Sequence, residues 1–166
     1  MYYLLILAVA VERLAEVAVA NRNARWALAN GGKEFGHHHY PVMVSIHVAL
    51  LLNCVAEVAL LHRPFLAPLG WPMLALVTAS QGLRWWCIAT LGRRWNTRVI
   101  VIPQEPLVRR GPYRWLHHPN YVAVVVEGFA LPLVHTAWLT AIGFTLANAA
   151  VLRVRIQVEN TALGYR

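Results

Sequence analysis

The chain has 166 residues, of which 58% are hydrophobic and 13% are charged, and its formal net charge is +8. Its mean hydropathy is +0.48; because soluble domains are about 45–50% apolar and about 25% charged, an ordinary soluble domain is excluded. We expect no nucleic-acid partner, because the cations lie in the gaps between apolar runs, where membrane lipids with anionic headgroups are their natural partners.

A membrane-spanning helix needs about 20 predominantly apolar residues. The segments that approach this requirement are residues 2–20, 41–61, 66–91, 119–136 and 137–153. The first segment lacks a basic start and is interrupted by Glu12, Arg13 and Glu16, so we interpret it as a retained span and not as a signal peptide. The sequence therefore predicts an all-α integral membrane protein with about five transmembrane helices in a single domain, residues 1–166.

Basic residues are concentrated on every second connection between these spans. Segments 21–40 and 92–118 and the tail from residue 153 together hold twelve lysines and arginines, whereas the opposite connections hold only Arg63. The positive-inside rule assigns the basic connections to the cytoplasm. We therefore expect the N-terminus outside and the C-terminus in the cytoplasm.

Several polar side chains lie inside the predicted spans, where ionisable groups are costly and normally face a partner or a wet cavity. They are Glu12, Arg13, Glu16, His47, Asn53, Glu57, Gln81, Arg84, Glu127 and Asn148. Two interpretations are open. In the first, Arg13 or Arg84 forms a structural pair with a glutamate; in the second, these residues line a polar cavity that opens toward the cytoplasm.

Residues 31–41 read Gly-Gly-Lys-Glu-Phe-Gly-His-His-His-Tyr-Pro. Three interpretations are open for this segment: a structural metal site, a lid over a headgroup or substrate, and an ordinary interfacial loop. Adjacent histidines point in different directions and no Cys or carboxylate spacing completes a ligand set, so we assign no metal. His47 follows inside the next span, where a histidine is more often a core residue than a ligand.

The densest polar block is residues 107–121, Leu-Val-Arg-Arg-Gly-Pro-Tyr-Arg-Trp-Leu-His-His-Pro-Asn-Tyr, between two apolar segments. A second polar piece begins at Arg153, where Arg155 and Glu159 are neighbours on one helix face. This pair is either a surface ion pair, which contributes little to stability, or part of a cavity shared with the 107–121 block. No Rossmann fingerprint, phosphate loop, HExxH or CxxC motif is present.

The order of these motifs is informative. Leu91-Gly92-x-x-Trp95 is followed by Gly111-Pro-Tyr113, His118-Pro-Asn-Tyr121, a hairpin of spans and Arg155-Ile-x-x-Glu159-x-x-x-Leu163. Over residues 85–163, this arrangement resembles the isoprenylcysteine carboxyl methyltransferase family; related phospholipid methyltransferases share the pattern. The resemblance implies an integral-membrane enzyme that uses S-adenosyl-L-methionine, with a methyltransferase core at 85–166 and N-terminal helices and a substrate-side loop at 1–84.

The N-terminal half, with Gly31-x-Lys-Glu-Phe-Gly36 and His39-Tyr-Pro41, is similar to a bacterial branch of that family that resembles alkylpyrone O-methyltransferases. This similarity implies a lipophilic small-molecule acceptor with an alkylpyrone-like hydroxyl or a carboxylate. It also implies a bacterial inner (plasma) membrane location, with the active site facing the cytoplasm.

The resemblance implies that the cofactor is bound by Tyr113, His118, Pro119, Tyr121, Arg155 and Glu159. Arg155 is expected to pair with the cofactor carboxylate, and Glu159 with its amine or ribose hydroxyls. The candidates for holding the acceptor, or for removing its proton, are Arg114, His117, His39, His47 and Glu34.

The sequence departs from the family pattern at two positions. His117 stands where the family usually has arginine, and histidine loses its charge near neutrality, so a role that needs a permanent guanidinium is in doubt. Asn160 stands where a second glutamate often follows the first. The missing carboxylate weakens the expectation of phospholipid N-methylation.

Two other functional classes are compatible with the composition. A haem or quinone redox protein could use His47 with His135 or His39, but His47 and His135 belong to opposite membrane sides in the predicted topology. A small transporter or a non-catalytic scaffold would account for the polar residues inside the spans. It gives no reason for the 107–121 block and the Arg155/Glu159 pair to occur together.

Overall fold

The structure is a computed structural model, and it describes residues 1–103 and 105–164. Arg166, one of the basic residues counted in the tail, lies outside these ranges. The described elements, in chain order, are α1 (Tyr2–Ala29), β1 (Lys33–Phe35), α2 (His39–Leu60), α3 (Ala67–Leu91), the 3₁₀ turn η1 (Gly92–Arg94), β2 (Val99–Val101), the 3₁₀ turn η2 (Gly111–Arg114), α4 (Pro119–Leu133) and α5 (Trp138–Leu163).

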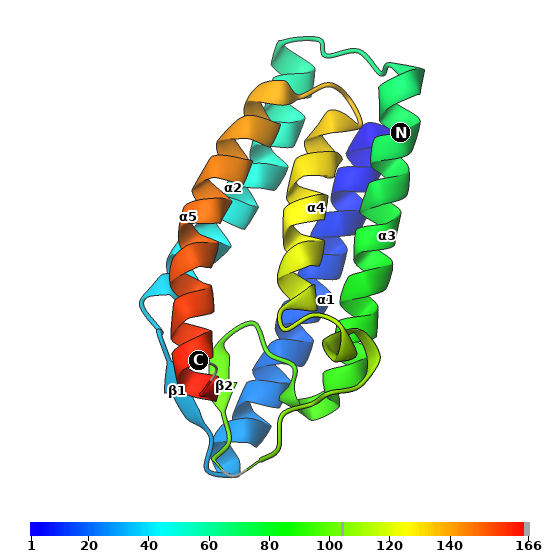
Figure 1. Cartoon of the computed structure of the whole chain (residues 1–166). Helices are drawn as coiled ribbons and strands as arrows, with labels where there is room; N and C mark the ends of the chain where they lie inside the picture. Colours follow the sequence, from blue (N-terminus) through cyan, green and yellow to red (C-terminus); the bar gives the residue numbers. More distant parts are fainter. Residues whose placement is uncertain (104, 165–166) are drawn as a thin grey trace.

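The helices form one elongated bundle (Figure 1), in which α3 packs against α4, α4 against α5, and α5 against α2. Both strands and both 3₁₀ turns lie at one end of the bundle, which we call the loop end. The connections 61–66 and 134–137 lie at the other end, which we call the hairpin end. The described basic segments therefore meet at the loop end, as the charge pattern predicts, while the side of the membrane that this end faces stays a prediction.

Two helices run well past their predicted ends. Helix α1 continues to Ala29 and α5 to Leu163, because residues 21–29 and 154–163 contain neither glycine nor proline and extend the helices with polar side chains outside the apolar runs. Gly164 follows α5 with φ of +72°, a left-handed conformation that glycine adopts without steric cost. Apolar runs therefore located the helices but underestimated their lengths.

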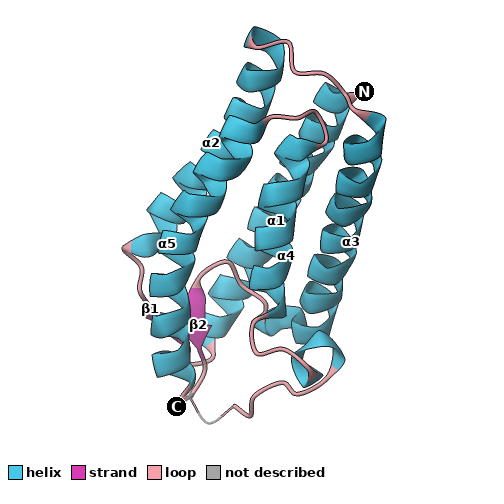
Figure 2. Cartoon of the chain, turned by 45° about the horizontal axis from the view of Figure 1, so that its top comes forward, coloured by secondary structure: helices cyan, strands magenta, loops and turns pink. Residues whose placement is uncertain are grey.

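The prediction of an all-α fold omitted a small antiparallel sheet. Strand β1 pairs with β2 in the register Lys33↔Val101, Glu34↔Ile100 and Phe35↔Val99. The two strands are the only ones among the described residues, and they lie beside the C-terminal half of α5 (Figure 2). The sheet joins two basic connections that lie far apart in the sequence.

The outer surface of the bundle is strongly apolar. Helices α2 and α5 are long and apolar enough to cross a membrane by length and composition, and α4 is a shorter apolar helix. Large apolar side chains stand exposed along the helices, including Leu14 (71%), Leu60 (76%) and Leu146 (68%). Soluble monomers rarely expose apolar patches of such extent, and lipid is the environment that accommodates them.

Charged residues inside α1, α3 and α4 pair with one another. Arg13 lies 2.5 Å from Glu16 and 3.0 Å from Glu127. Arg84 forms an ion pair with Glu127 and lies 3.6 Å from Glu16. The interpretation of Arg13 and Arg84 as structural partners of glutamates is confirmed, and the pairing explains how α1 carries Arg13 and Glu16 within its apolar run.

Candidate functional site

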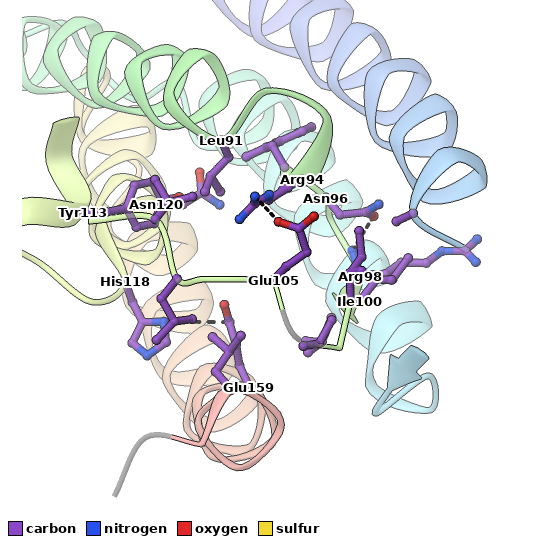
Figure 3. Close-up of a pocket in the computed structure, with 18 of the residues that line it drawn as sticks. Leu91, Arg94, Asn96, Arg98, Ile100, Glu105, Tyr113, His118, Asn120 and Glu159 are labelled. Atoms are coloured by element: carbon purple, nitrogen blue, oxygen red, sulfur yellow. Dashed lines mark hydrogen bonds and ion pairs between the residues drawn. The ribbon is translucent and has the colours of Figure 1, made fainter. Parts of the chain in front are cut away.

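A cavity of about 180 Å³ opens at the loop end between β2, η2, the start of α4 and the last turns of α5 (Figure 3). One water molecule needs only about 10–15 Å³ on this measure, so the cavity has room for an organic ligand. The predicted site residues that line it are Tyr113, His117, His118, Tyr121, Arg155 and Glu159. The 107–121 block and the Arg155/Glu159 pair therefore share one cavity, as the second interpretation of this pair predicts.

The phenol of Tyr121 connects the two polar pieces. Arg155 donates from Nε to Tyr121 Oη at 2.7 Å, and Tyr121 Oη in turn donates to a carboxylate oxygen of Glu159. Arg155 also donates from Nη2 to the carbonyl of Thr97 at 2.5 Å and from Nη1 to the sulfur of Met43 at 3.2 Å. Each guanidinium nitrogen thus has a partner within the protein, and α5 is tied to α4, α2 and the segment before β2.

His118 stacks on the ring of Tyr121, with centroids 5.3 Å apart, and is also held by α5. Its Nε2 lies 2.8 Å from Oδ1 of Asn160, and its Nδ1 lies 3.8 Å from Glu159. An amide oxygen is an acceptor, so this contact favours the tautomer with a proton on Nε2. Asn160, one of the two departures from the family pattern, therefore orients a predicted cofactor-binding histidine.

Local backbone geometry explains the order Gly-Pro-Tyr at the start of η2. Gly111 has φ of +55°, and a Cβ there would lie 2.5 Å from Oγ1 of Thr90, so a side chain meets both strain and a clash. Pro112 is buried, and Tyr113 faces the cavity with its phenol near the thiol of Cys87. Burial raises the pKa of Tyr113 well above its usual range, so this phenol keeps its proton and serves as a donor.

Pro119 occupies the first turn of α4, as predicted, where its missing N–H costs no hydrogen bond. The residue is buried at the base of the His118–Tyr121 pair. Its place in the fold is that of a helix start.

The predicted acceptor residues are more dispersed. Glu34 and His39 line a small neighbouring cavity that shares Arg98 and Arg155 with the larger one, and Glu34 lies 3.6 Å from Arg98. His39 Nδ1 lies 3.1 Å from the carbonyl of Gly36. The structure thus brings part of the 31–41 segment to the edge of the candidate site.

His47 and Arg114 lie outside both of these cavities. His47 is one turn beyond Met43, with Nδ1 2.8 Å from the Met43 carbonyl and its ring edge-on to Phe144 at 5.3 Å. Arg114 is the last residue of η2 and points to the outside of the turn, where it is exposed. His117, also exposed, is the acceptor candidate that lines the larger cavity itself.

Two buried polar atoms of residues that line the cavity have no hydrogen-bond partner in the described part of the chain: Nε1 of Trp95 and Oδ1 of Asn120. A buried donor and a buried acceptor left unpaired are costly, and both atoms belong to residues in the wall of the cavity. Apolar lining from Leu91, Val99 and Leu107 accompanies them. A ligand with polar groups and an apolar or aromatic body fits this lining.

Sequence reasoning did not assign Trp95 and Asn120 to the site, although both belong to the quoted motifs. It also missed Arg94, whose ion pair with Glu105 crosses the cavity mouth, and Arg98 (Figure 3). The basic character of residues 92–98 was used only for topology. The separation of these residues from the 107–121 block hid their convergence, which depends on β2.

Comparison with known proteins gives a consistent result. A model of the isoprenylcysteine carboxyl methyltransferase (ICMT) family matches residues 73–165. The chain is 39% identical over 165 residues to the uncharacterized protein YpbQ of Bacillus subtilis (strain 168). The aligned region covers 98% of this chain and 96% of that protein. It is 22% identical over 156 residues to an uncharacterized protein of Haemophilus influenzae, covering 92% and 89% of the two chains.

The family match covers more than half of the chain, and it includes η2, α4 and α5, which carry the aromatic, histidine and Arg/Glu components of the cavity. Members of this family are membrane methyltransferases, in agreement with the apolar surface of the bundle. The chain belongs to the isoprenylcysteine carboxyl methyltransferase family.

Proposed function

We propose that the protein is an integral-membrane O-methyltransferase that binds S-adenosyl-L-methionine in the loop-end cavity and methylates a lipophilic small molecule. The observation that carries the proposal is the convergence of Tyr113, His118, Tyr121 and Glu159 on one cavity beside the unpaired polar atoms of Trp95 and Asn120. A mixed polar and apolar lining suits a cofactor that combines an amino acid, a nucleoside and a sulfonium.

In this proposal, Glu159 accepts from the cofactor's amine or ribose hydroxyls, because its carboxylate is partly exposed (26%) toward the cavity. Arg155 acts chiefly as a positioning residue, since its three nitrogens already donate to Tyr121, Thr97 and Met43. This differs from the expectation that Arg155 pairs with the cofactor carboxylate. The protonated phenol of Tyr113, which lines the cavity, is a further donor.

When bound, S-adenosylmethionine supplies an electrophilic methyl group that passes to the acceptor oxygen while the C–S bonding pair returns to sulfur. The residues of the chain position the acceptor in line and keep water away. An enolic hydroxyl or a carboxylate that is ionised at neutral pH needs orientation more than a strong base. His117 at the cavity, and Glu34 and His39 in the adjoining one, are the groups that we assign to the acceptor side.

The acceptor class that we favour is an alkylpyrone-like hydroxyl or a carboxylate on a long hydrocarbon. The loop-end cavity lies at the end of an apolar bundle, so a hydrocarbon chain can remain in lipid while its polar head reaches the cavity. The bacterial resemblance of residues 31–41 supports a small-molecule acceptor. We further propose that the protein resides in the bacterial inner membrane with the loop end in the cytoplasm, where the cofactor is available.

The test is calorimetric titration of S-adenosylmethionine and S-adenosylhomocysteine into detergent-purified protein. We expect micromolar binding that falls about tenfold or more, equivalent to about 1.4 kcal/mol, in Glu159→Ala. Gln157→Ala is the matched control, since Gln157 is exposed on the same helix and does not line the cavity. Absence of binding to protein that melts cooperatively would refute the cofactor assignment and favour a transporter or scaffold.

A further inference from the structure

The 107–121 block has a second face that the proposed methyl transfer does not use. Residues 109–116, which we call the basic turn, expose the side chains of Arg109, Arg110 and Arg114. Trp115 is 67% exposed and Leu116 43% exposed beside them. Three guanidinium groups and two large apolar side chains therefore share one exposed turn at the loop end.

The turn is held firmly against a bundle helix. Gly111 packs on Thr90, and the Trp115 ring lies edge-on to Trp86 with centroids 5.9 Å apart, so both contacts are with the last turns of α3. In Figure 1 this short turn lies beside the loop end of α3. Arg110 precedes the 3₁₀ turn in an extended conformation and Arg114 ends the turn. At about 2 Å per residue in the turn and about 3.8 Å for the extended step, their backbone positions are at most about 10 Å apart. The long side chains of Arg110 and Arg114 can therefore reach one phosphate or two neighbouring ones, and Arg109 is the next residue along the chain.

The protein supplies no counter-charge to this turn within the described residues. The chain has seven carboxylate side chains, and each has another partner. Glu12 accepts from Gln81 and Trp85, and the other six contact Arg13, Arg84, Arg98, Arg63, Arg94, Tyr121 or His118. The described hydrogen bonds of the three guanidinium groups comprise one long contact, from Arg110 Nη2 to the carbonyl of Thr90 at 3.4 Å.

We propose that the outer face of the basic turn binds the phosphate groups of anionic phospholipids in the membrane that surrounds the protein. Arginine matches phosphate by paired N–H donors, and tryptophan is favoured at the headgroup level because its ring is amphipathic. The exposed Trp115 and Leu116 are accounted for by a lipid surface and not by a soluble anion. The inference rests on the membrane location of the bundle and is independent of cofactor binding.

The experiment uses the full-length protein in nanodiscs of phosphatidylcholine. About 20 mol% of the lipid is brominated phosphatidylglycerol in one sample and brominated phosphatidylcholine in the other. Bromine quenches nearby tryptophan fluorescence, so preferential quenching reports an enriched lipid. We expect brominated phosphatidylglycerol to quench at least twofold more strongly. Trp115→Phe should remove most of this difference, because Trp115 is the exposed tryptophan of the turn.

Two variants that lose the same charge provide the decisive comparison. Replacing Arg109, Arg110 and Arg114 by glutamine should abolish the preference for phosphatidylglycerol. Replacing Arg22, Arg25 and Lys33 by glutamine, which removes three exposed cations from the other basic connection, should leave it intact. Equal quenching by the two lipids in the wild-type protein would overturn the proposal, as would equal loss in both triple variants, which would indicate attraction by net charge alone. Failure of S-adenosylhomocysteine to bind would affect only the proposed function.

Discussion

Removal of the Glu57 carboxylate, at the hairpin end of the bundle, should lower the free energy of unfolding by several kcal/mol, on the order of a buried ion pair. Glu57 is 7% exposed at the end of α2, and it accepts from the backbone N–H groups of Leu139 and Thr140 at 3.2 and 2.7 Å. It also accepts from Oγ1 of Thr140 at 2.7 Å and from Nε of Arg63 at 3.0 Å. A carboxylate of α2 therefore caps the start of α5, where helix N–H groups have no partner within their own helix.

The magnitude follows from what Glu57→Ala leaves unpaired. Each N–H of the first turn of α5 that loses its acceptor costs about 1–3 kcal/mol where water cannot replace it, and Arg63, partly exposed, turns to solvent at little cost. The two N–H groups together give about 2–6 kcal/mol, a range that includes the cost of breaking a buried ion pair, about 3–5 kcal/mol. For a chain of this size, about 1 kcal/mol shifts the melting temperature by about 2–4 °C, so we expect a fall on the order of 10 °C.

Thermal unfolding of the detergent-solubilised protein, followed by circular dichroism, measures this effect. Glu57→Gln retains one acceptor oxygen and should lose less than half as much. Glu105→Ala is the control, since the Glu105–Arg94 pair is well exposed and contributes under about 1 kcal/mol. A Glu57→Ala variant that melts within about 2 °C of the Glu105→Ala variant would refute the assignment of Glu57 as the cap of α5.

Three other changes test packing and the site. Gly128→Ala should destabilise the protein by about 1–3 kcal/mol, because its Cβ would lie 1.9 Å from the ring of Phe144; Phe144→Leu should recover part of the loss in thermal melts. Gly111→Ala should lower the free energy of unfolding by about 1–3 kcal/mol, because Gly111 has a positive φ. It should also weaken S-adenosylhomocysteine binding in calorimetry. Gly143→Ala is the control, since a Cβ at Gly143 would lie in open space, and it should change neither quantity. Tyr121→Phe removes two hydrogen bonds worth about 1 kcal/mol each, so the melting temperature should fall by about 4–8 °C. Because Glu159 loses the phenol that holds it at the cavity, the calorimetric Kd should also rise about tenfold or more.

The apolar runs and the charge alternation were sufficient to locate the helices and to place the described basic segments at one end. Hydropathy reports where a helix is apolar and not where it stops, so the polar extensions of α1 and α5 were missed. The sheet was missed for a different reason. Strands Lys33–Phe35 and Val99–Val101 have three residues each and pair across more than sixty positions of sequence, so neither carries a periodic signal of its own.

The cofactor residues implied by the motifs gather at one cavity, whereas the acceptor residues do so only in part. Motif spacing encodes local geometry, as in the Gly111 turn and the Pro119 helix start. It does not encode which distant element closes the cavity. Trp95 and Asn120 became candidates only when the fold showed their buried polar atoms without partners beside the cavity.

The Arg155/Glu159 pair lies at the shared cavity, as one of its two interpretations predicts, and the described contacts do not include the direct ion pair of the other. Helical spacing predicts a direct ion pair between neighbours on one face, yet the described contacts join the two residues through the phenol of Tyr121. Because Arg155 is only 8% exposed and is also bonded to Thr97, its charge stabilises the junction of α5, α4 and β2. Glu159 keeps a carboxylate at the cavity because a phenol on α4, and not the neighbouring guanidinium, is its partner. In this chain, the motif residues therefore form a wall of the cavity as well as candidate ligands.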